Sequence, residues 1–371
     1  MTSHSARIAA IDLNGQLRGK RVAADDISKD MQMPFSAINL DIFGCDINGS
    51  PLVYAMGDRD GWLVPVGRDP VPMPWLARET MLDLRMMTRD NRSPYTGDPR
   101  QALIAALAPF RARADRVVAA AELEFFLFPE QHHSADDILS IRALDRLELF
   151  FNAIDDGADA MGLPARVITS EAAPGQYEVT LTHGPALRLA DDIILMKELI
   201  KGTARAHGLT ATFHPKPNEG TSGTGLHIHC SILDKSGKNI FSDGTFRGTP
   251  ELQHAIAGLL SKLEASTAIL APFPVSYDRF VGEAHAPTNA SWGYDNRTVA
   301  VRVPAGRSSA RRLEHRVAGG DANPYLLLAV ILGAINEGLQ RRETAPPPTT
   351  GNAYQASNAG ITQNLHQALD A

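Results

Sequence analysis

The sequence predicts an α+β fold in two parts, on the basis of three observations. From about residue 99 onward, strand-like and helix-like segments alternate, which is typical of α/β or α+β bodies. Before that, short strand-like segments and turn signals dominate, and a Pro-rich run at 69–74 separates the two regions. The chain has 371 residues, enough for two or three domains. We therefore divide it into domains at residues 1–75 and 76–371.

The first part is expected to be a small β-rich unit. Strands are predicted at 8–13 and 16–22, joined by the hairpin signal Asn14-Gly15. Further short strands are predicted at 37–43 and 63–66.

The second part is expected to alternate strands with long helices. Strong helix formers or a 3.6-residue apolar period predict helices at 99–115, 138–161, 187–207, 250–271 and 321–340. Apolar, β-prone segments predict strands at 117–128, 167–170, 177–182, 210–214, 225–233, 298–303 and 312–317. The tail from residue 342 is rich in Pro, Thr, Asn and Gly, and is expected to be extended.

Composition excludes several classes of partner. The net charge of −6 argues against nucleic acid and anionic membranes. No apolar run approaches the roughly 20 residues that span a bilayer, and the first residues lack a secretory h-region. The two cysteines, Cys45 and Cys230, have no CxxC partner, so we expect a reduced, cytoplasmic chain.

Charged residues occur two apart in several predicted strands, and such residues share one face of a strand. Glu122 and Glu124 interrupt an otherwise apolar segment. The same spacing places His227 with His229, and Arg312 with Glu314 and Arg316, while Glu171 and Glu178 flank a turn. Taken singly, these patterns also fit an exposed edge strand, a structural histidine or a surface ion-pair ladder. Their recurrence in one chain favours a shared site.

These residue types suit metal-assisted phosphoryl transfer. Five carboxylates and an imidazole can hold two hard divalent cations, Mg²⁺ or Mn²⁺, and arginines recognise phosphates and carboxylates. No GxxxxGK[ST] motif is present, and the Gly-rich residues 222–225 precede a predicted strand, not a helix. Positioning and charge neutralisation would therefore carry the chemistry.

Six blocks, in order along residues 8–355, resemble the glutamine synthetase superfamily. They lie at 121–128, 175–178, 211–217, 225–229, 296–298 and 312–325. The resemblance implies a small N-terminal β-grasp-like domain and a catalytic domain with a curved antiparallel sheet flanked by helices. It also implies ATP-dependent ligation of an amine to the γ-carboxyl of glutamate through γ-glutamyl phosphate, with two or more Mg²⁺ or Mn²⁺ ions.

Position in these blocks implies a function for each site residue. One metal would be held by Glu124, Glu171 and Glu178, and a second by Glu122, His227 and Glu314. ATP would contact His229, Ser231, Arg302 and Arg312, and glutamate would contact Arg279, Gly223 and Glu171. Arg297, Arg316 and His285 would be catalytic, the arginines by stabilising the transferring phosphoryl group.

Two departures from the family pattern bear on substrate and assembly. The Phe-Asp-Gly-Ser-Ser block of ammonia-using members is not recognisable around Asp41 and Asp46, and His285 stands where they carry a flap glutamate. A protonated His is a poor ammonium ligand, although a neutral imidazole can serve as a base. The loss of both carboxylate features argues for a bulkier amine than ammonia. The whole pattern resembles the γ-glutamylpolyamine and γ-glutamylamide synthetase branch, with an organic amine or polyamine as acceptor. The C-terminal region is shorter than usual for the family, although a homo-oligomer, a hexameric ring or stacked rings with active sites between subunits, is still expected.

Two alternatives remain open at this point. One is a glutamine synthetase that uses ammonia. The other is a truncated, non-catalytic homologue that binds nucleotide or partner subunits.

Overall fold

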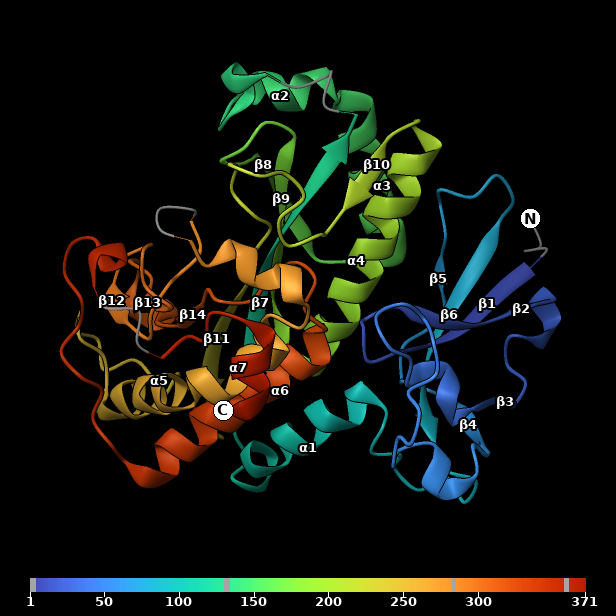
Figure 1. Ribbon diagram of the computed structural model, residues 1–371, viewed down its shortest axis with the longest axis horizontal. Helices are drawn as coiled ribbons and strands as arrows, with labels where there is room; N and C mark the ends of the chain where they lie inside the picture. Colours follow the sequence, from blue (N-terminus) through green and yellow to red (C-terminus); the bar gives the residue numbers. More distant parts are fainter. Residues whose placement is uncertain (1–4, 130–133, 282–284, 357–359) are drawn as a thin grey trace.

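The computed structural model describes residues 5–129, 134–281, 285–356 and 360–371, and its strands form two sheets (Figure 1). The smaller sheet, drawn in blue, lies beside a larger one whose long strand β7 runs through the middle of the molecule (Figure 1). Helices surround the larger sheet, so the predicted α+β class is confirmed.

The smaller sheet has six strands in the order β2-β1-β6-β4-β3, with β5 added alongside β6. The strands are β1 (Ser5–Ile11), β2 (Leu17–Val22), β3 (Met31–Pro34), β4 (Asp60–Pro65), β5 (Val71–Pro72) and β6 (Thr80–Thr88). The predicted hairpin is confirmed, because β1 and β2 pair antiparallel around the turn. β1 and β6 are parallel, and β6 carries the sheet past residue 75.

The strand predicted at 37–43 is wrong. Residues Phe35–Ile38 form a 3₁₀ turn, after which Asp41 Oδ1 accepts hydrogen bonds from the backbone N–H groups of Phe43 and Cys45 at 2.8 Å each. Such local side-chain bonds offer the backbone an alternative to a strand ladder. Phe43 is consequently 83% exposed rather than packed in a sheet.

The larger sheet has eight strands in the order β12-β13-β14-β11-β7-β9-β8, with β10 beside β7. All pairs are antiparallel except β12 with β13. The strands are β7 (Arg116–Phe128), β8 (Ala165–Ser170), β9 (Gln176–Pro185), β10 (Thr210–Thr212), β11 (Leu226–Leu233), β12 (Trp292–Tyr294), β13 (Val301–Val303) and β14 (Leu313–His315). β13 and β14 are shorter than predicted.

In the described part of the chain, seven α-helices lie around this sheet and below it (Figure 1). They are α1 (Pro99–Ala112), α2 (Ile141–Arg146), α3 (Glu148–Met161), α4 (Ala186–Ala206), α5 (Pro250–Leu270), α6 (Pro324–Arg341) and α7 (Leu365–Asp370). α4 lies against β7, β9 and β10, where Leu123 and Phe125 of β7 are completely buried. The opposite face of β7 is left for polar side chains.

The single helix predicted at 138–161 is wrong, because the segment forms α2 and α3 with a break at Leu147. Ser140 caps α2, its hydroxyl accepting a hydrogen bond from the N–H of Arg142, so the helix begins only there. The apolar residues that completed the predicted period are not buried: Leu139 and Ile141 are 69% and 74% exposed.

Buried polar contacts fix the smaller sheet against the larger part. Asn323, the N-cap of α6, donates from Nδ2 to the carbonyls of Asp12 and Leu13 at 3.0 and 3.2 Å. The residue that caps α6 in the larger part therefore also holds the turn after β1 in the smaller sheet. Arg100 of α1 also links the two parts, because it donates to Asp191 of α4 at 3.0 Å and to the carbonyl of Val66 at 3.4 Å.

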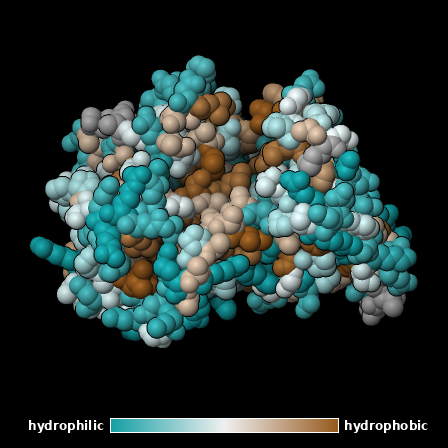
Figure 2. Space-filling view, turned by 90° about the horizontal axis from the view of Figure 1, so that it is seen from below, coloured by the Kyte–Doolittle hydropathy of each residue, from teal (hydrophilic) through white to brown (hydrophobic). Residues whose placement is uncertain are grey.

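The face seen from below is mostly hydrophilic, with a hydrophobic strip near its middle (Figure 2). Within the described ranges, no helix has both the length and the apolar character needed to cross a bilayer.

Candidate active site

A row of polar side chains crosses one face of the larger sheet, and the strand register puts it there. β7 pairs Glu122 with His227 of β11, and Glu124 with Glu178 of β9. Further along, His229 of β11 lies opposite Glu314 of β14, and Glu314 opposite Arg302 of β13. Directly opposed residues have Cβ atoms about 5 Å apart, so their side chains interact. The predicted sharing of one face by these residues is confirmed.

Glu122 lies between two imidazoles. Its Oε2 is 3.2 Å from Nδ1 of His227 and its Oε1 is 2.9 Å from Nε2 of His229. Arg312 Nε donates to Nδ1 of His229 at 3.2 Å, so this ring donates to Glu122 through Nε2–H. Burial acts to raise the pKa of Glu122, but the two imidazoles outweigh it and hold that pKa below its usual range.

Glu124 is anchored by different partners. Its Oε2 accepts from the backbone N–H of Gly225 at 2.8 Å and from Nε2 of Gln176 at 2.9 Å. A Cβ at Gly225 would lie 2.7 Å from Nε2 of His227 and 3.1 Å from Oε1 of Glu124, so this position has no room for a side chain. The remaining Oε1 faces His227 Nε2 at 3.9 Å.

Glu171 and Glu178 add two more carboxylates to the same space. Burial, together with the charges of Glu124 and Glu122, raises the pKa of Glu171 to about 7. Burial and the three neighbouring carboxylates raise the pKa of Glu178 to about 9. Four acids in one buried space therefore lack enough cations for all of them to ionise.

Among the residues that the structure describes, two groups of three have ligand atoms within 4.8 Å of one another. They are Glu122 with Glu178 and His227, and Glu122 with His229 and Glu314. Glu122 belongs to both. This grouping differs from the sequence assignment, which put Glu178 with Glu124 and Glu171, and gave His229 to ATP.

Glu314 lies completely buried between two arginines. Arg302 donates to its Oε2 at 2.9 Å, and Arg316 pairs with its Oε1. Burial opposes ionisation, but the Arg316 charge and the histidines outweigh it and lower the pKa of Glu314. Arg302 is held from its other side by Asp295 Oδ1 at 2.6 Å.

Arg279 and Gly223 meet at the end of the row. Arg279 is 2% exposed and donates to the carbonyl of Val317 at 2.9 Å, while its Nε has no partner within the described part of the chain. A Cβ at Gly223 would lie 2.2 Å from the carbonyl oxygen of Pro215 and 2.7 Å from Cγ of Arg279. The close contact therefore depends on glycine at this position.

Part of this row lines one enclosed cavity of about 100 Å³, called the catalytic pocket below. Glu122, Glu124, Glu171, Glu178, His227, Gly223, Arg279, His285, Arg297 and Arg316 all line it. His285 and Arg297 are exposed at its edge. Residues 282–284, just before His285, are outside the described ranges.

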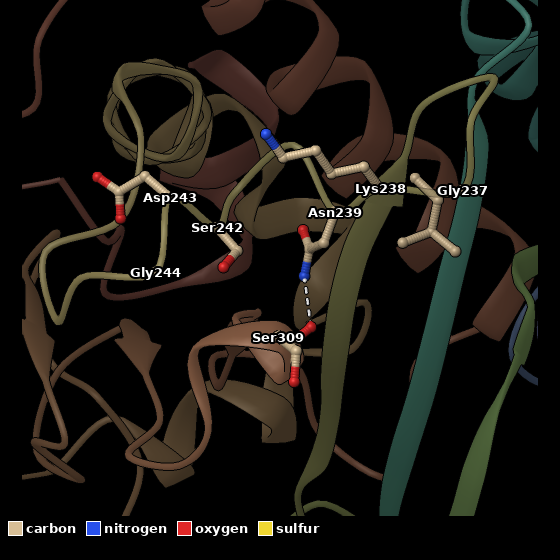
Figure 3. Close-up of a pocket in the computed structure, with 8 residues that line it drawn as sticks. Gly237, Lys238, Asn239, Ser242, Asp243, Gly244 and Ser309 are labelled. Atoms are coloured by element: carbon tan, nitrogen blue, oxygen red, sulfur yellow. Dashed lines mark hydrogen bonds between the residues drawn. The ribbon is translucent and has the colours of Figure 1, made fainter.

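A larger cavity of about 480 Å³ adjoins the row on the other side of Glu122. His229, Ser231 and Arg312 line it together with apolar residues of β7 and β11. A third cavity, of about 420 Å³, shares Leu233, Asn239 and Ser309 with it (Figure 3). Asn239 reaches across to the carbonyl of Ser309 at 3.4 Å (Figure 3). Three of the four residues predicted to contact ATP therefore line the same cavity, and the fourth, Arg302, does not line it.

Sequence reasoning missed Gln176 and Asp295. Gln176 Nε2 donates to Glu124 and, at 3.1 Å, to the carbonyl of Gly223, so it connects the two predicted residues. Asp295 stands two residues before Arg297 and orients Arg302. Both are within or beside blocks that the sequence identified, but only the three-dimensional contacts reveal their partners.

Comparisons with known proteins identify relatives over most of the chain. The family described as glutamine synthetase, catalytic domain, matches residues 96–371. The chain is 34% identical to γ-glutamylputrescine synthetase of Escherichia coli (strain K12), over 93% of this chain and 77% of that protein. It is 31% identical to glutamate–isopropylamine ligase of a Pseudomonas species, over 95% and 81%. Among solved structures, a GmaS–ADP complex has a TM-score of 0.87 at 27% identity, covering 100% of this chain and 87% of that one.

Proposed function

This chain belongs to the glutamine synthetase family, and from that premise we infer that it is a glutamate–amine ligase. It joins an amine to the γ-carboxyl of glutamate with ATP, and relatives of that activity cover nearly all of the chain. The observation that carries the assignment is the row of carboxylates, imidazoles and arginines across the sheet. Such a row suits a reaction in which polyanionic phosphates and a carboxylate must meet.

The catalytic pocket fits divalent cations. Burial and the charges of the neighbouring carboxylates raise the pKa values of Glu171 and Glu178, although Arg279, Arg297 and Arg316 line the same pocket. Hard cations with oxygen-rich ligands, Mg²⁺ or Mn²⁺, would favour ionisation of these carboxylates. The residues that would hold them are Glu122, Glu124, Glu171, Glu178, His227 and Glu314, with Glu122 shared. When bound, the metals neutralise phosphate charge and orient the transferring phosphoryl group.

The residues of the chain then act on two substrates in turn. His229, Ser231, Arg302 and Arg312 contact ATP, in keeping with the cavity that three of them line. Arg279 and Gly223 bind glutamate, with Glu171 close by. The γ-phosphoryl group passes to the γ-carboxylate, ADP leaves, and Arg297 and Arg316 stabilise the transferring charge.

In the second step the amine nitrogen attacks the acyl phosphate carbon, and inorganic phosphate leaves. The amine must lose a proton as the amide forms. His285, at the edge of the catalytic pocket, is placed to accept that proton when its imidazole is neutral. The acceptor is an organic amine, because this position carries no carboxylate that would bind ammonium.

The same proposal extends to domains, assembly and location. The mixed sheet with its parallel β1–β6 pair supports a β-grasp-like first domain, although its sheet continues beyond residue 75. Exposed Ile42, Phe43 and Ile47 in that domain support a homo-oligomer, a hexameric ring or stacked rings with active sites between subunits. An ATP-dependent enzyme whose cysteines are both free fits the cytoplasm.

An amine panel tests the function. Purified protein is incubated with ATP, Mg²⁺, glutamate and either ammonia or one of several organic amines, and phosphate release is measured. We expect amine-dependent release that disappears without glutamate, and the γ-glutamyl amide by mass spectrometry. Faster turnover with ammonia than with every organic amine would favour a glutamine synthetase, and silence with all of them would contradict a ligase.

A further inference from the structure

A second pocket adjoins the catalytic pocket. It has a volume of about 460 Å³ and shares Ala172, Ser222 and His285 with the catalytic pocket. Its other walls come from Ile138, which leads into α2 at the top of Figure 1, and from Ala173, Pro174, Lys216, Gly220, Thr221 and Val281. Pockets of roughly 300–1,000 Å³ are typical of small-molecule sites. A molecule that reaches from one pocket to the other would pass His285.

The two pockets differ in the groups that line them. The catalytic pocket is lined by four carboxylates and by Arg279, Arg297 and Arg316. In the second pocket, the described lining residues include no carboxylate, and several are apolar: Ile138, Ala173, Pro174 and Val281. Among these described residues, Lys216 brings an ammonium group to the wall.

The surroundings of Lys216 already disfavour positive charge. Burial, with the guanidinium of Arg279 adding to it, lowers the pKa of Lys216, and only Asp278 acts in the opposite direction. A second cation brought into this pocket would meet the same burial and the Lys216 charge as well. An uncharged hydrocarbon or hydroxyl group would meet Ile138, Val281 and the hydroxyl of Thr221 instead.

We propose that this second pocket binds the distal part of the acceptor amine, and that the acceptor is a monoamine with an uncharged tail rather than a diamine. The inference rests on the proposed ligase function and narrows it. The reacting nitrogen lies in the catalytic pocket, and the tail extends past His285. Lys216 orients the amine, because the opposite orientation would place its ammonium beside this side chain.

The decisive comparison uses two amines of equal carbon number, n-butylamine and 1,4-diaminobutane. Amine-dependent phosphate release is measured with saturating ATP, Mg²⁺ and glutamate, and kcat/KM is determined for each. We expect n-butylamine to exceed 1,4-diaminobutane by about tenfold or more, the factor that corresponds to 1.4 kcal/mol. The comparison uses the unaltered protein and so needs no variant to fold.

A charge reversal at Lys216 tests whether its ammonium is what disfavours the diamine. In Lys216→Glu the new carboxylate would attract the distal ammonium, so the ratio of the two kcat/KM values should shift toward 1,4-diaminobutane by about tenfold. Lys235→Glu makes the same charge change on an exposed turn and should leave the ratio as it is. Circular dichroism verifies that both variants are folded.

The outcomes separate this inference from the ligase assignment. Turnover with 1,4-diaminobutane equal to or above that with n-butylamine overturns the monoamine inference and leaves the ligase standing. An unchanged ratio in folded Lys216→Glu also overturns it. Phosphate release with no amine at all, or with ammonia alone, overturns both.

Discussion

Metal binding at the catalytic pocket should displace protons. Without a cation, burial and neighbouring carboxylates raise the pKa of Glu178 to about 9 and that of Glu171 to about 7. A bound divalent cation would reverse this effect, because it favours the ionised form of each ligand. Adding Mn²⁺ to the metal-free protein is therefore the perturbation, and released protons are the response.

The expected number follows from those two pKa values. At pH 7, Glu178 is almost fully protonated and Glu171 is about half protonated. Binding that ionises both should release between one and two protons per chain, about 1.5 at pH 7 and about one at pH 8. Below pH 7, the affinity for the metal should fall with each pH unit, by about tenfold for every proton that binding displaces.

Calorimetric titration in buffers of different ionisation enthalpy measures the protons directly. The observed heat should depend linearly on the buffer enthalpy, with a slope equal to the number released. Glu178→Gln should reduce that slope by about one. Glu264→Gln removes an exposed carboxylate on α5 and should not change it. Heats that are the same in every buffer would refute the reasoning, because they would mean that the carboxylates are already ionised.

Three further predictions concern single residues. Gly223→Ala places a Cβ 2.2 Å from the carbonyl oxygen of Pro215, so the KM for glutamate should rise about tenfold or more in steady-state assays. Asp295→Asn weakens the support of Arg302, so the KM for ATP should rise about fivefold while that for glutamate stays constant. Lys197 is buried, and burial together with Lys201 lowers its pKa to about 7. The unfolded state therefore binds more protons from pH 7 to about 10.4, and stability should rise with pH there by up to about 5 kcal/mol. In Lys197→Met this rise should be missing when denaturation is compared at pH 7 and 9.5.

Each of these predictions has a matched control. Gly333→Ala adds a Cβ where no atom lies within 4 Å, and should leave the KM for glutamate as it is. Asp60→Asn alters an exposed aspartate of β4 and should not affect ATP. An unchanged KM in Gly223→Ala or Asp295→Asn would contradict the proposed contact. Parallel stability profiles of the unaltered protein and Lys197→Met would contradict the low pKa of Lys197.

The sequence predicted the elements of the larger sheet better than those of the smaller one. Long strands such as β7 have an apolar face that packs against α4, and this periodicity is local. β6 was missed because Asp83 and Arg85 interrupt its apolar pattern. In the structure they are buried as an ion pair at 2.7 Å. A pattern based on hydrophobicity cannot identify polar residues that neutralise each other inside a sheet.

The candidate site was predicted as a set of residues but not as a set of contacts. Alternation placed His227 with His229 on one face, and the register of β11 confirms this. The grouping of His229 with Glu314 depends on β11 pairing with β14, which lies about 80 residues away along the chain. No local pattern encodes that pairing, and the contacts of Gln176 and Asp295 depend on equally distant segments.

β7 shows why the contacts matter more than the motif. Glu122 and Glu124 share a face, so spacing alone makes them equivalent. Their neighbours make them different. On β11, two imidazoles face both oxygens of Glu122, whereas a backbone N–H and a side-chain amide hold one oxygen of Glu124. Glu124 is fixed in place by the loop at 223–225, and Glu122 is the acid common to both groups of candidate ligands. The difference in contacts between two identical side chains therefore comes from the segments on either side of β7, not from β7 itself.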